Sequence, residues 1–199
     1  MKKILMFLIC FVMIFSFALP SFALTFSDVA DNSWFRTYVY DLTEKGVVNG
    51  YTDGTFRPDN KVTVAEFIKL IISASAPDIN YDLVSSDFNH WAAKYVRVGE
   101  NYGVFEVGEY TLENIDQEIS RIEIVKILSR CDMLIKETPQ NSVFKQFSDT
   151  ANLSEDDLLY LSHAVGIGVI NGDTEGTFRP NDSLLRSECA KVIYMYTNR

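Results

Sequence analysis

Two stretches of ten residues decide how this chain is organised: NGYTDGTFRP at 49–58 and NGDTEGTFRP at 171–180. The second copy begins 122 positions (171 minus 49) after the first. The copies differ at two positions, Tyr51 against Asp173 and Asp53 against Glu175. Near-identity at a fixed offset indicates an internal duplication. Because Asn-Gly and Asp-Gly supply the positive φ angles of tight turns, and proline fixes the chain that leaves them, each copy predicts a turn.

Helical patterns lie on both sides of each turn. Before the first copy, apolar side chains recur at helical spacing from Trp34 to Leu42, and a second pattern follows Thr63. The later copy has matching patterns at 158–165 and 185–196. Each repeat is therefore predicted to consist of a helix, a glycine-rich turn and a second helix.

A third unit lies between these two and lacks the ten-residue phrase. Trp91 opens its first helical pattern and Ser120-Arg-Ile-Glu123 opens its second. Since one unit is too small to bury its own apolar face, we expect all three to pack together. The expected fold is one all-α, mainly helical body with pseudo-threefold symmetry. The predicted repeats are repeat 1 at 25–76, a degenerate repeat 2 at 85–132 and repeat 3 at 147–197.

The second helices share their opening residues. A hydroxyl residue followed three positions later by glutamate, the capping-box pattern, begins two of them at Thr63 and Ser120. Leu185 takes that place in repeat 3, so Ser183 is its candidate cap. Each glutamate is followed three positions later by a lysine with which it can pair, namely Lys69, Lys126 or Lys191.

The N-terminus predicts export. Two lysines precede an apolar run at 4–19 and a small-residue cleavage pattern ending at Ala23. The run is shorter than the ~20 residues of a membrane-spanning helix, so residues 1–23 are interpreted as a signal peptide rather than an anchor. Cleavage would leave 16 basic against 27 acidic side chains, a net charge of −11. We expect no nucleic-acid partner, because phosphate would be repelled, and no membrane span after cleavage.

Catalytic and metal-binding patterns find little support. The chain has two histidines, His90 and His163, and no Gly-x-Ser-x-Gly, HExxH or phosphate-loop motif. Cys131 and Cys189 lie among apolar helix positions, which favours buried thiols over a disulfide framework. A calcium loop at 171–182 would need a bidentate glutamate at its last position, where the chain has aspartate. We expect a protein that is not an enzyme and that uses no cofactor and no metal.

Arg121 and Arg186 occupy the first helical position of the second helix in repeats 2 and 3. The helix dipole is positive there, so a cation is locally unfavourable. A helix N-terminus with an added guanidinium can hold a carboxylate or phosphate. An internal ion pair with Glu118 or Asp182 is the structural alternative, and the sequence leaves both open. Val64 takes the equivalent place in repeat 1.

The repeats resemble the S-layer homology (SLH) family over about 25–196. The residues that carry the resemblance are Phe26-Ser-Asp-Val29, Trp34, Gly46 to Pro58, Thr63-Val-Ala-Glu66, Ser120-Arg-Ile-Glu123, Phe147-Ser-Asp149 and Gly168 to Pro180. The resemblance implies a three-pronged spindle in which the second helices form a central bundle. It also implies grooves that bind a secondary cell-wall polysaccharide, commonly capped by pyruvylated N-acetylmannosamine. Such domains hold exported proteins on the cell surface of Gram-positive bacteria without a covalent link.

The resemblance further implies which residues touch the ligand. The family's second-helix arginine, here Arg121 and Arg186, meets the acidic ketal. Trp34 and Trp91 match a first-helix tryptophan that packs internally or lines a groove. Turn residues that match the groove lining are Asn49, Gly50, Asn171 and Gly172.

Three departures from the family pattern predict that one or two grooves work rather than three. Val64 replaces an arginine, Asp156 falls near the place of a third tryptophan, and repeat 2 has no ten-residue phrase. The resemblance therefore predicts wall anchoring. The alternative is a protein-interaction or S-layer assembly module on the envelope, partnered by another envelope protein and with vestigial grooves. A wall hydrolase is a more distant third.

Overall fold

The computed structural model describes residues 25–86, 88–137 and 147–199. Within these ranges the chain forms six α-helices, one short 3-10 helix and isolated bridges but no longer strands, so the mainly helical prediction is confirmed. The elements are α1 (Arg36–Glu44), α2 (Val64–Ser75), η1 (Tyr81–Leu83), α3 (Ala93–Asn101), α4 (Arg121–Leu134), α5 (Glu155–Gly166) and α6 (Arg186–Thr197). The predicted signal peptide, 1–23, lies outside the described residues. None of the described helices is long and apolar enough to cross a bilayer.

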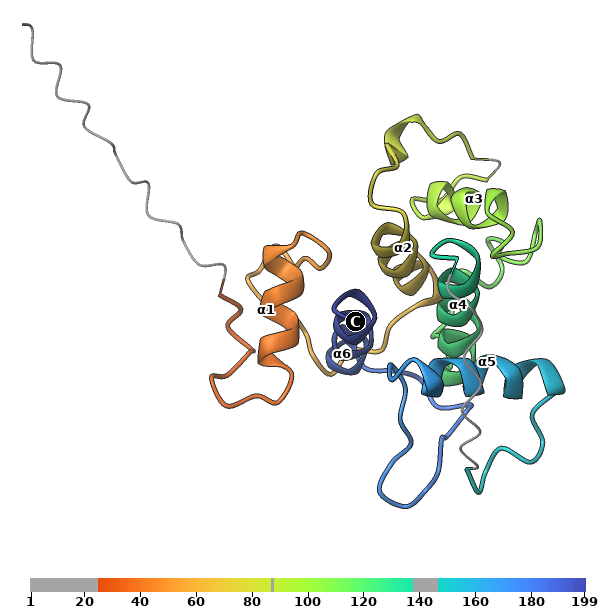
Figure 1. The fold of residues 1–199 in the computed structure, drawn as a ribbon. Helices are drawn as coiled ribbons and strands as arrows, with labels where there is room; N and C mark the ends of the chain where they lie inside the picture. Colours follow the sequence, from red (N-terminus) through yellow and green to blue (C-terminus); the bar gives the residue numbers. More distant parts are fainter. Residues whose placement is uncertain (1–24, 87, 138–146) are drawn as a thin grey trace, which may run out of the picture.

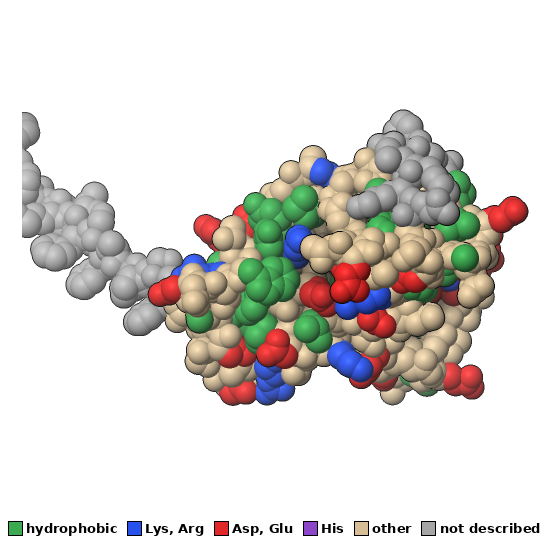
Figure 2. Space-filling view, turned by 90° about the horizontal axis from the view of Figure 1, so that it is seen from below, with side chains coloured by type: hydrophobic (Ala, Val, Ile, Leu, Met, Phe, Trp, Pro, Cys, Tyr) green, Lys and Arg blue, Asp and Glu red, His purple; other side chains and the backbone are tan. Residues whose placement is uncertain are grey.

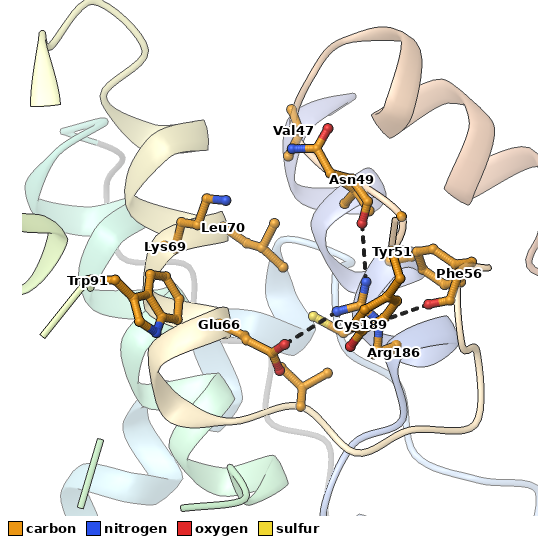
Figure 3. A pocket seen from close by; sticks show the side chains of 14 residues that line it. Val47, Asn49, Tyr51, Phe56, Glu66, Lys69, Leu70, Trp91, Arg186 and Cys189 are labelled. Atoms are coloured by element: carbon orange, nitrogen blue, oxygen red, sulfur yellow. Dashed lines mark hydrogen bonds and ion pairs between the residues drawn. The ribbon is translucent and has the colours of Figure 1, made fainter. Parts of the chain in front are cut away.

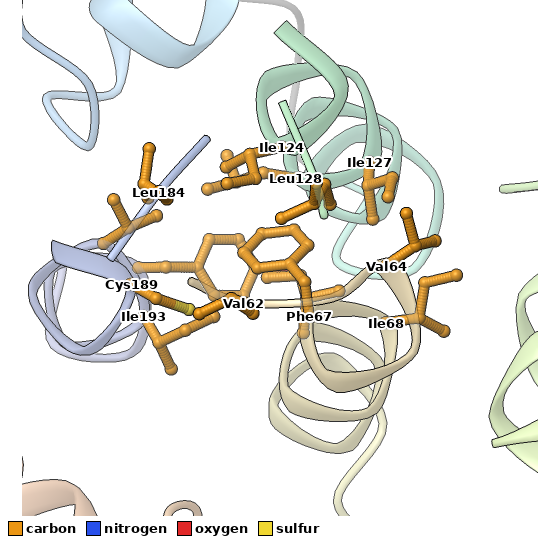
Figure 4. Packing of buried hydrophobic residues seen from close by; sticks show 14 of the residues in the cluster. Val62, Val64, Phe67, Ile68, Ile124, Ile127, Leu128, Leu184, Cys189 and Ile193 are labelled. Atoms are coloured by element: carbon orange, nitrogen blue, oxygen red, sulfur yellow. The ribbon is translucent and has the colours of Figure 1, made fainter. Parts of the chain in front are cut away.

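The second helices of the three repeats, α2, α4 and α6, form the centre of the molecule (Figure 1). Their apolar side chains meet in one buried cluster. Figure 4 shows Phe67 of α2, Ile124 of α4 and Ile193 of α6 in one cluster, and all three are fully buried. Burial of side chains of this size stabilises by about 1.5–3 kcal/mol each. The core therefore belongs to the three repeats jointly.

The first helices pack on the centre in a circular order. Helix α3 packs on α2, α5 packs on α4, and α1 packs on α6 (Figure 1). The helix, turn, helix order predicted for each repeat is present in the chain. Its outer helix, however, packs mainly on the inner helix of the preceding repeat, with repeat 1 following repeat 3. The three repeats are consequently interlocked into a closed ring.

Short backbone bridges join the segments that enter the inner helices. Lys61 pairs with Leu185, Thr63 with Glu118, and Ser120 with Ser183. At each helix start, the first two backbone N–H groups donate to carbonyls of a neighbouring repeat. The first N–H group of each helix donates to a backbone carbonyl: that of Val64 to Gln117 at 3.0 Å, that of Arg121 to Asp182 at 2.9 Å and that of Arg186 to Asn60 at 2.8 Å. These bonds supply acceptors for donors that a helix cannot satisfy itself.

The predicted caps are confirmed in part. Thr63 and Glu66 form the reciprocal capping box, and the Ser120 hydroxyl accepts from the N–H three positions on. The prediction of Ser183 as the third cap is wrong, because its hydroxyl donates to Glu118 instead. Glu118 also binds Lys61 at 2.6 Å. These interactions connect equivalent positions of the three repeats.

The duplicated phrase recurs for a packing reason. A Cβ atom on Gly172 would lie 2.2 Å from the ring of Phe147 and 2.7 Å from a backbone oxygen, so only glycine fits. The carboxylate of Asp149 accepts the N–H groups of Phe178 and Arg179, at 2.8 and 2.6 Å. These bonds hold Arg179 at a φ of 56°. In repeat 1, Gly50, Phe26, Asp28, Phe56 and Arg57 make the same arrangement.

We expect the substitution Asp149→Ala to destabilise the fold by about 1–3 kcal/mol, because the N–H groups of buried Phe178 and exposed Arg179 lose a charged acceptor. Burial alone would raise the pKa of Asp149, but the N–H groups of Phe178 and Arg179 hold it below its usual value. A carboxylate whose pKa is lower in the folded than in the unfolded state stabilises the fold at pH values above its unfolded-state pKa of about 4. This stabilisation is lost as the pH falls through the folded-state pKa. Urea unfolding should show a gap between wild type and variant at pH 7 that narrows below pH 4. Asp59→Ala, at an exposed position, is the control; an equal loss there would contradict the prediction.

Candidate functional site

Two hollows of about 220 Å³ each open beside the duplicated turns. We call groove 1 the hollow lined by the turn at 47–51 together with Lys69, and groove 3 the hollow lined by the turn at 168–173 together with Lys191. The eight ligand residues predicted from sequence all line these hollows, four in each. Groove 1 contains Asn49, Gly50, Trp91 and Arg186, and groove 3 contains Asn171, Gly172, Trp34 and Arg121.

Each groove is assembled from three repeats. In groove 3 the turn and Lys191 come from repeat 3, Arg121 comes from repeat 2, and Trp34 comes from repeat 1. In groove 1 the same parts come from repeats 1, 3 and 2 in that order. Figure 3 shows Trp91 facing Arg186 and Tyr51 across groove 1, with Glu66 between them. The circular packing of the outer helices produces this composition.

The two tryptophans form rims. Trp34 is 57% exposed and Trp91 is 52% exposed. The sequence left open whether these tryptophans pack internally or line a groove, and in the structure both line a groove. An exposed indole beside polar groups presents a flat apolar face to solvent.

Arg186 connects its own helix to the turn of repeat 1. Its Nε donates to the carbonyl of Phe56 at 3.0 Å, and its Nη2 donates to the carbonyl of Asn49 at 3.3 Å. Its Nη1 lies 3.5 Å from Oε1 of Glu66 (Figure 3). The guanidinium also lies over the rings of Tyr51 and Phe56. Three sides of this cation therefore have protein partners.

Arg121 is held more loosely. Its Nε donates to the carbonyl of Phe178 at 2.7 Å, and the guanidinium lies 5.2 Å from the centre of that ring. The sequence offered Glu118 or Asp182 as ion-pair partners, but the carboxyl of Asp182 lies 3.7 Å from Arg179, and Glu118 binds Lys61. Burial lowers the pKa of Arg121.

The backbone N–H groups beside these arginines are already hydrogen-bonded within the protein. Sequence alone suggested that the N–H groups of the helix start would help to hold an anion. The first two N–H groups of α4 donate to Asp182 and Pro180, and those of α6 donate to Asn60 and Pro58. They are therefore not free for a ligand. An anion in either groove would depend on the side chains.

Val64, Asp156 and the altered turn of repeat 2, the three departures from the repeat pattern, all belong to the same groove. By the circular order, a groove at repeat 2 would take its turn from repeat 2, its arginine from the position of Val64 and its tryptophan from the position of Asp156. Neighbouring contacts support this placement, because Asp157 lies 4.0 Å from Lys126. One groove has lost all three parts, and grooves 1 and 3 have lost none.

Side chains of repeat 2 bind one another at that place. The Tyr110 hydroxyl donates to Glu123, and Arg130 binds Glu109 at 2.8 Å. Lys126 lies 3.3 Å from Glu123, so the predicted glutamate–lysine pair forms in repeat 2. In repeat 1 this prediction is wrong, because Glu66 pairs with Arg186.

Neither the histidines nor the cysteines add a second site. His163 is fully buried and lies 2.9 Å from Asp132, so it joins α5 to α4. Cys131 and Cys189 are buried free thiols, as predicted. The described part of the chain contains no group of three acidic, histidine or cysteine side chains that could hold a metal ion.

Residues 25–68 and 160–190 match the family model of the S-layer homology domain. These two regions belong to the S-layer homology family. They include both duplicated turns, Glu66 and Arg186, whereas repeat 2 lies outside them. The resemblance inferred from the turns is thereby confirmed.

Similar curated proteins carry names from the bacterial cell surface and from polysaccharide-degrading enzymes. An amylopullulanase of Thermoanaerobacterium thermosulfurigenes is 29% identical over 174 residues, which is 85% of this chain and 9% of that protein. A cellulosome-anchoring protein of Acetivibrio thermocellus is 28% identical over 135 residues, which is 64% of this chain and 29% of that protein. An S-layer protein of Bacillus licheniformis is 24% identical over 172 residues, which is 85% of this chain and 19% of that protein. The chain spans less than a third of each of these relatives.

Sequence reasoning missed the roles of Tyr51 and Glu66 in groove 1. Tyr51 stood out only as a mismatch between the two copies, and Glu66 only as a capping residue. Their contact with Arg186 joins positions more than 100 residues apart, and the 122-residue offset carries no information about such a contact. The mismatch at Tyr51 was the one available signal.

Proposed function

We propose that this chain is a non-catalytic module that anchors an exported protein to the bacterial cell wall. Grooves 1 and 3 bind an acidic secondary wall polysaccharide without a covalent bond. The observation that carries the proposal is the matched composition of the two grooves, each with an exposed tryptophan, an arginine and a lysine. In each groove the tryptophan, the arginine and the lysine come from three different repeats.

This combination suits an acidic sugar. An indole face stacks on the apolar face of a pyranose ring, and a guanidinium binds a carboxylate through charge-assisted hydrogen bonds. A pyruvate ketal places a carboxylate directly on a sugar ring, so a pyruvylated glycan supplies both features. Because the rest of the mature chain is acidic, attraction to such a polymer is confined to the grooves.

The relatives support anchoring rather than catalysis. Those with enzyme names are matched over small parts of their length, 9% for the amylopullulanase. A cellulosome-anchoring protein and an S-layer protein match the same module. These relatives support a location on the cell surface. With the predicted signal peptide, we propose that the protein is exported to the wall of a Gram-positive bacterium.

The test is binding of residues 25–199 to purified acidic wall polymer and to the same polymer after removal of the ketal. We expect wild type to prefer the acidic form, and Arg121→Ala/Arg186→Ala to lose that preference and bind at least tenfold more weakly, since one hydrogen bond to a charged group contributes about 1.5–3 kcal/mol. Arg36→Ala, on the outer helix α1, is the control. Equal binding to both polymers would refute recognition of the acidic group, and binding to neither would refute the glycan proposal and direct the search to a protein partner.

A further inference from the structure

The two letters that differ between the duplicated phrases change how the turns are built. In repeat 1, Asp53 accepts from the N–H and the hydroxyl of Thr55, at 3.0 and 2.6 Å, and lies 2.8 Å from Arg57. In repeat 3, Asp173 takes over this role toward Thr177 and Arg179. The carboxylate that binds the turn therefore comes from Asp173, which is equivalent to Tyr51, and not from Glu175, which is equivalent to Asp53.

This exchange leaves the two groove arginines in different surroundings. The ring of Tyr51 lies under the guanidinium of Arg186, with 5.1 Å between Cζ and the ring centroid, and Glu66 lies on another side of the same cation. An incoming anion would have to compete with the Glu66 carboxylate and would be repelled by it. Arg186 is therefore already neutralised by the protein.

Groove 3 offers an open cation instead. Arg121 is bonded through Nε, and no carboxylate of the described residues comes within 4.0 Å of its guanidinium nitrogens. Glu188, equivalent to Glu66, accepts from the N–H of Leu185 and forms no ion pair with Arg121. Asp173 is occupied by its own turn. The terminal Nη groups of Arg121 can consequently bind a ligand carboxylate without displacing a protein carboxylate.

We infer that the two grooves differ in ligand chemistry, and that positions 51 and 53 in one turn and 173 and 175 in the other set the difference. Groove 3 binds the anionic group of the polysaccharide through Arg121. Groove 1 binds an uncharged sugar against Trp91, and Arg186 acts there as a positioning residue that holds the turn. This inference rests on the proposed wall-polysaccharide function and divides the task between the two sites.

The test exchanges the two turns. Tyr51→Asp/Asp53→Glu gives repeat 1 the phrase of repeat 3, and Asp173→Tyr/Glu175→Asp does the reverse. Calorimetry would give the affinity of each variant for acidic and ketal-free polymer at about 0.05 and 0.5 M NaCl, where screening differs strongly. We expect the second exchange to lower the preference for acidic polymer and its salt dependence, and the first to raise both.

Two single substitutions complete the design. Arg121→Ala should lower affinity for acidic polymer about tenfold and remove the preference for it. Arg186→Ala should weaken binding of both polymers by a similar factor and keep the preference; should that variant fold poorly, the turn exchanges, which retain both arginines, still test the inference. Equal loss of preference in the two arginine variants would overturn the inference while leaving the anchoring function intact. Failure of wild type to bind either polymer would instead overturn the function.

Discussion

A chain cut after Glu137, which keeps repeats 1 and 2, is expected to lose cooperative folding. Helix α1 packs on α6, where Tyr38 meets Tyr194 with 5.0 Å between ring centres. Without repeat 3, the buried side chains of α1, Val39 and Leu42, would face water. Each such exposure costs about 1.5–3 kcal/mol, against a typical total stability of 5–15 kcal/mol.

The hydrogen bonds of the ring would be lost as well. Helix α4 begins with N–H groups that donate to Asp182 and Pro180, both in repeat 3. Helical circular dichroism and thermal unfolding of residues 25–137 should show little helix and no sharp transition, whereas residues 25–199 unfold cooperatively. Mixing the fragment with residues 147–199 should restore the transition. A cooperative transition in the fragment alone would mean that the repeats are independent units.

Much of the fold follows from the sequence because the repeats share one register. The 122-residue offset predicted the equivalence of Glu66 and Glu188, and the hydroxyl–glutamate pattern predicted the capping box at Thr63. Local rules of this kind depend on residues three or four apart. They placed the inner helices and the turns correctly.

The way in which the repeats contact one another could not be predicted in this manner. A repeat period fixes equivalent positions but not which outer helix packs on which inner helix. Val64, Asp156 and the altered turn of repeat 2 therefore suggested losses spread over three repeats. The circular order assigns them to a single groove.

Ser183 and the helix starts at Arg121 and Arg186 differ from the prediction for a related reason. A hydroxyl near a helix start suggests a cap, and a free helix N-terminus suggests an anion site. In this chain, backbone carbonyls of the neighbouring repeat satisfy the first N–H groups, and Ser183 binds Glu118. Competition from distant partners is not encoded in a local pattern.

The composite grooves lead to the second large effect, which concerns pairs of substitutions. Trp34 and Arg121 are 87 positions apart in different repeats but line the same groove. Trp34→Ala/Arg121→Ala should therefore abolish one ligand site and leave groove 1 intact. Trp34→Ala/Arg186→Ala has the same chemical change but affects both grooves, so it should weaken both sites.

The most direct measurement is the number of sites for a short oligosaccharide of the wall polymer, determined by titration calorimetry. Two sites are predicted for residues 25–199, one for Trp34→Ala/Arg121→Ala, and no intact site for Trp34→Ala/Arg186→Ala. Thermal unfolding of each variant would verify that it is folded. Three sites in the wild type would contradict the loss of the groove at repeat 2. Loss of both sites in Trp34→Ala/Arg121→Ala would contradict the assembly of each groove from three repeats.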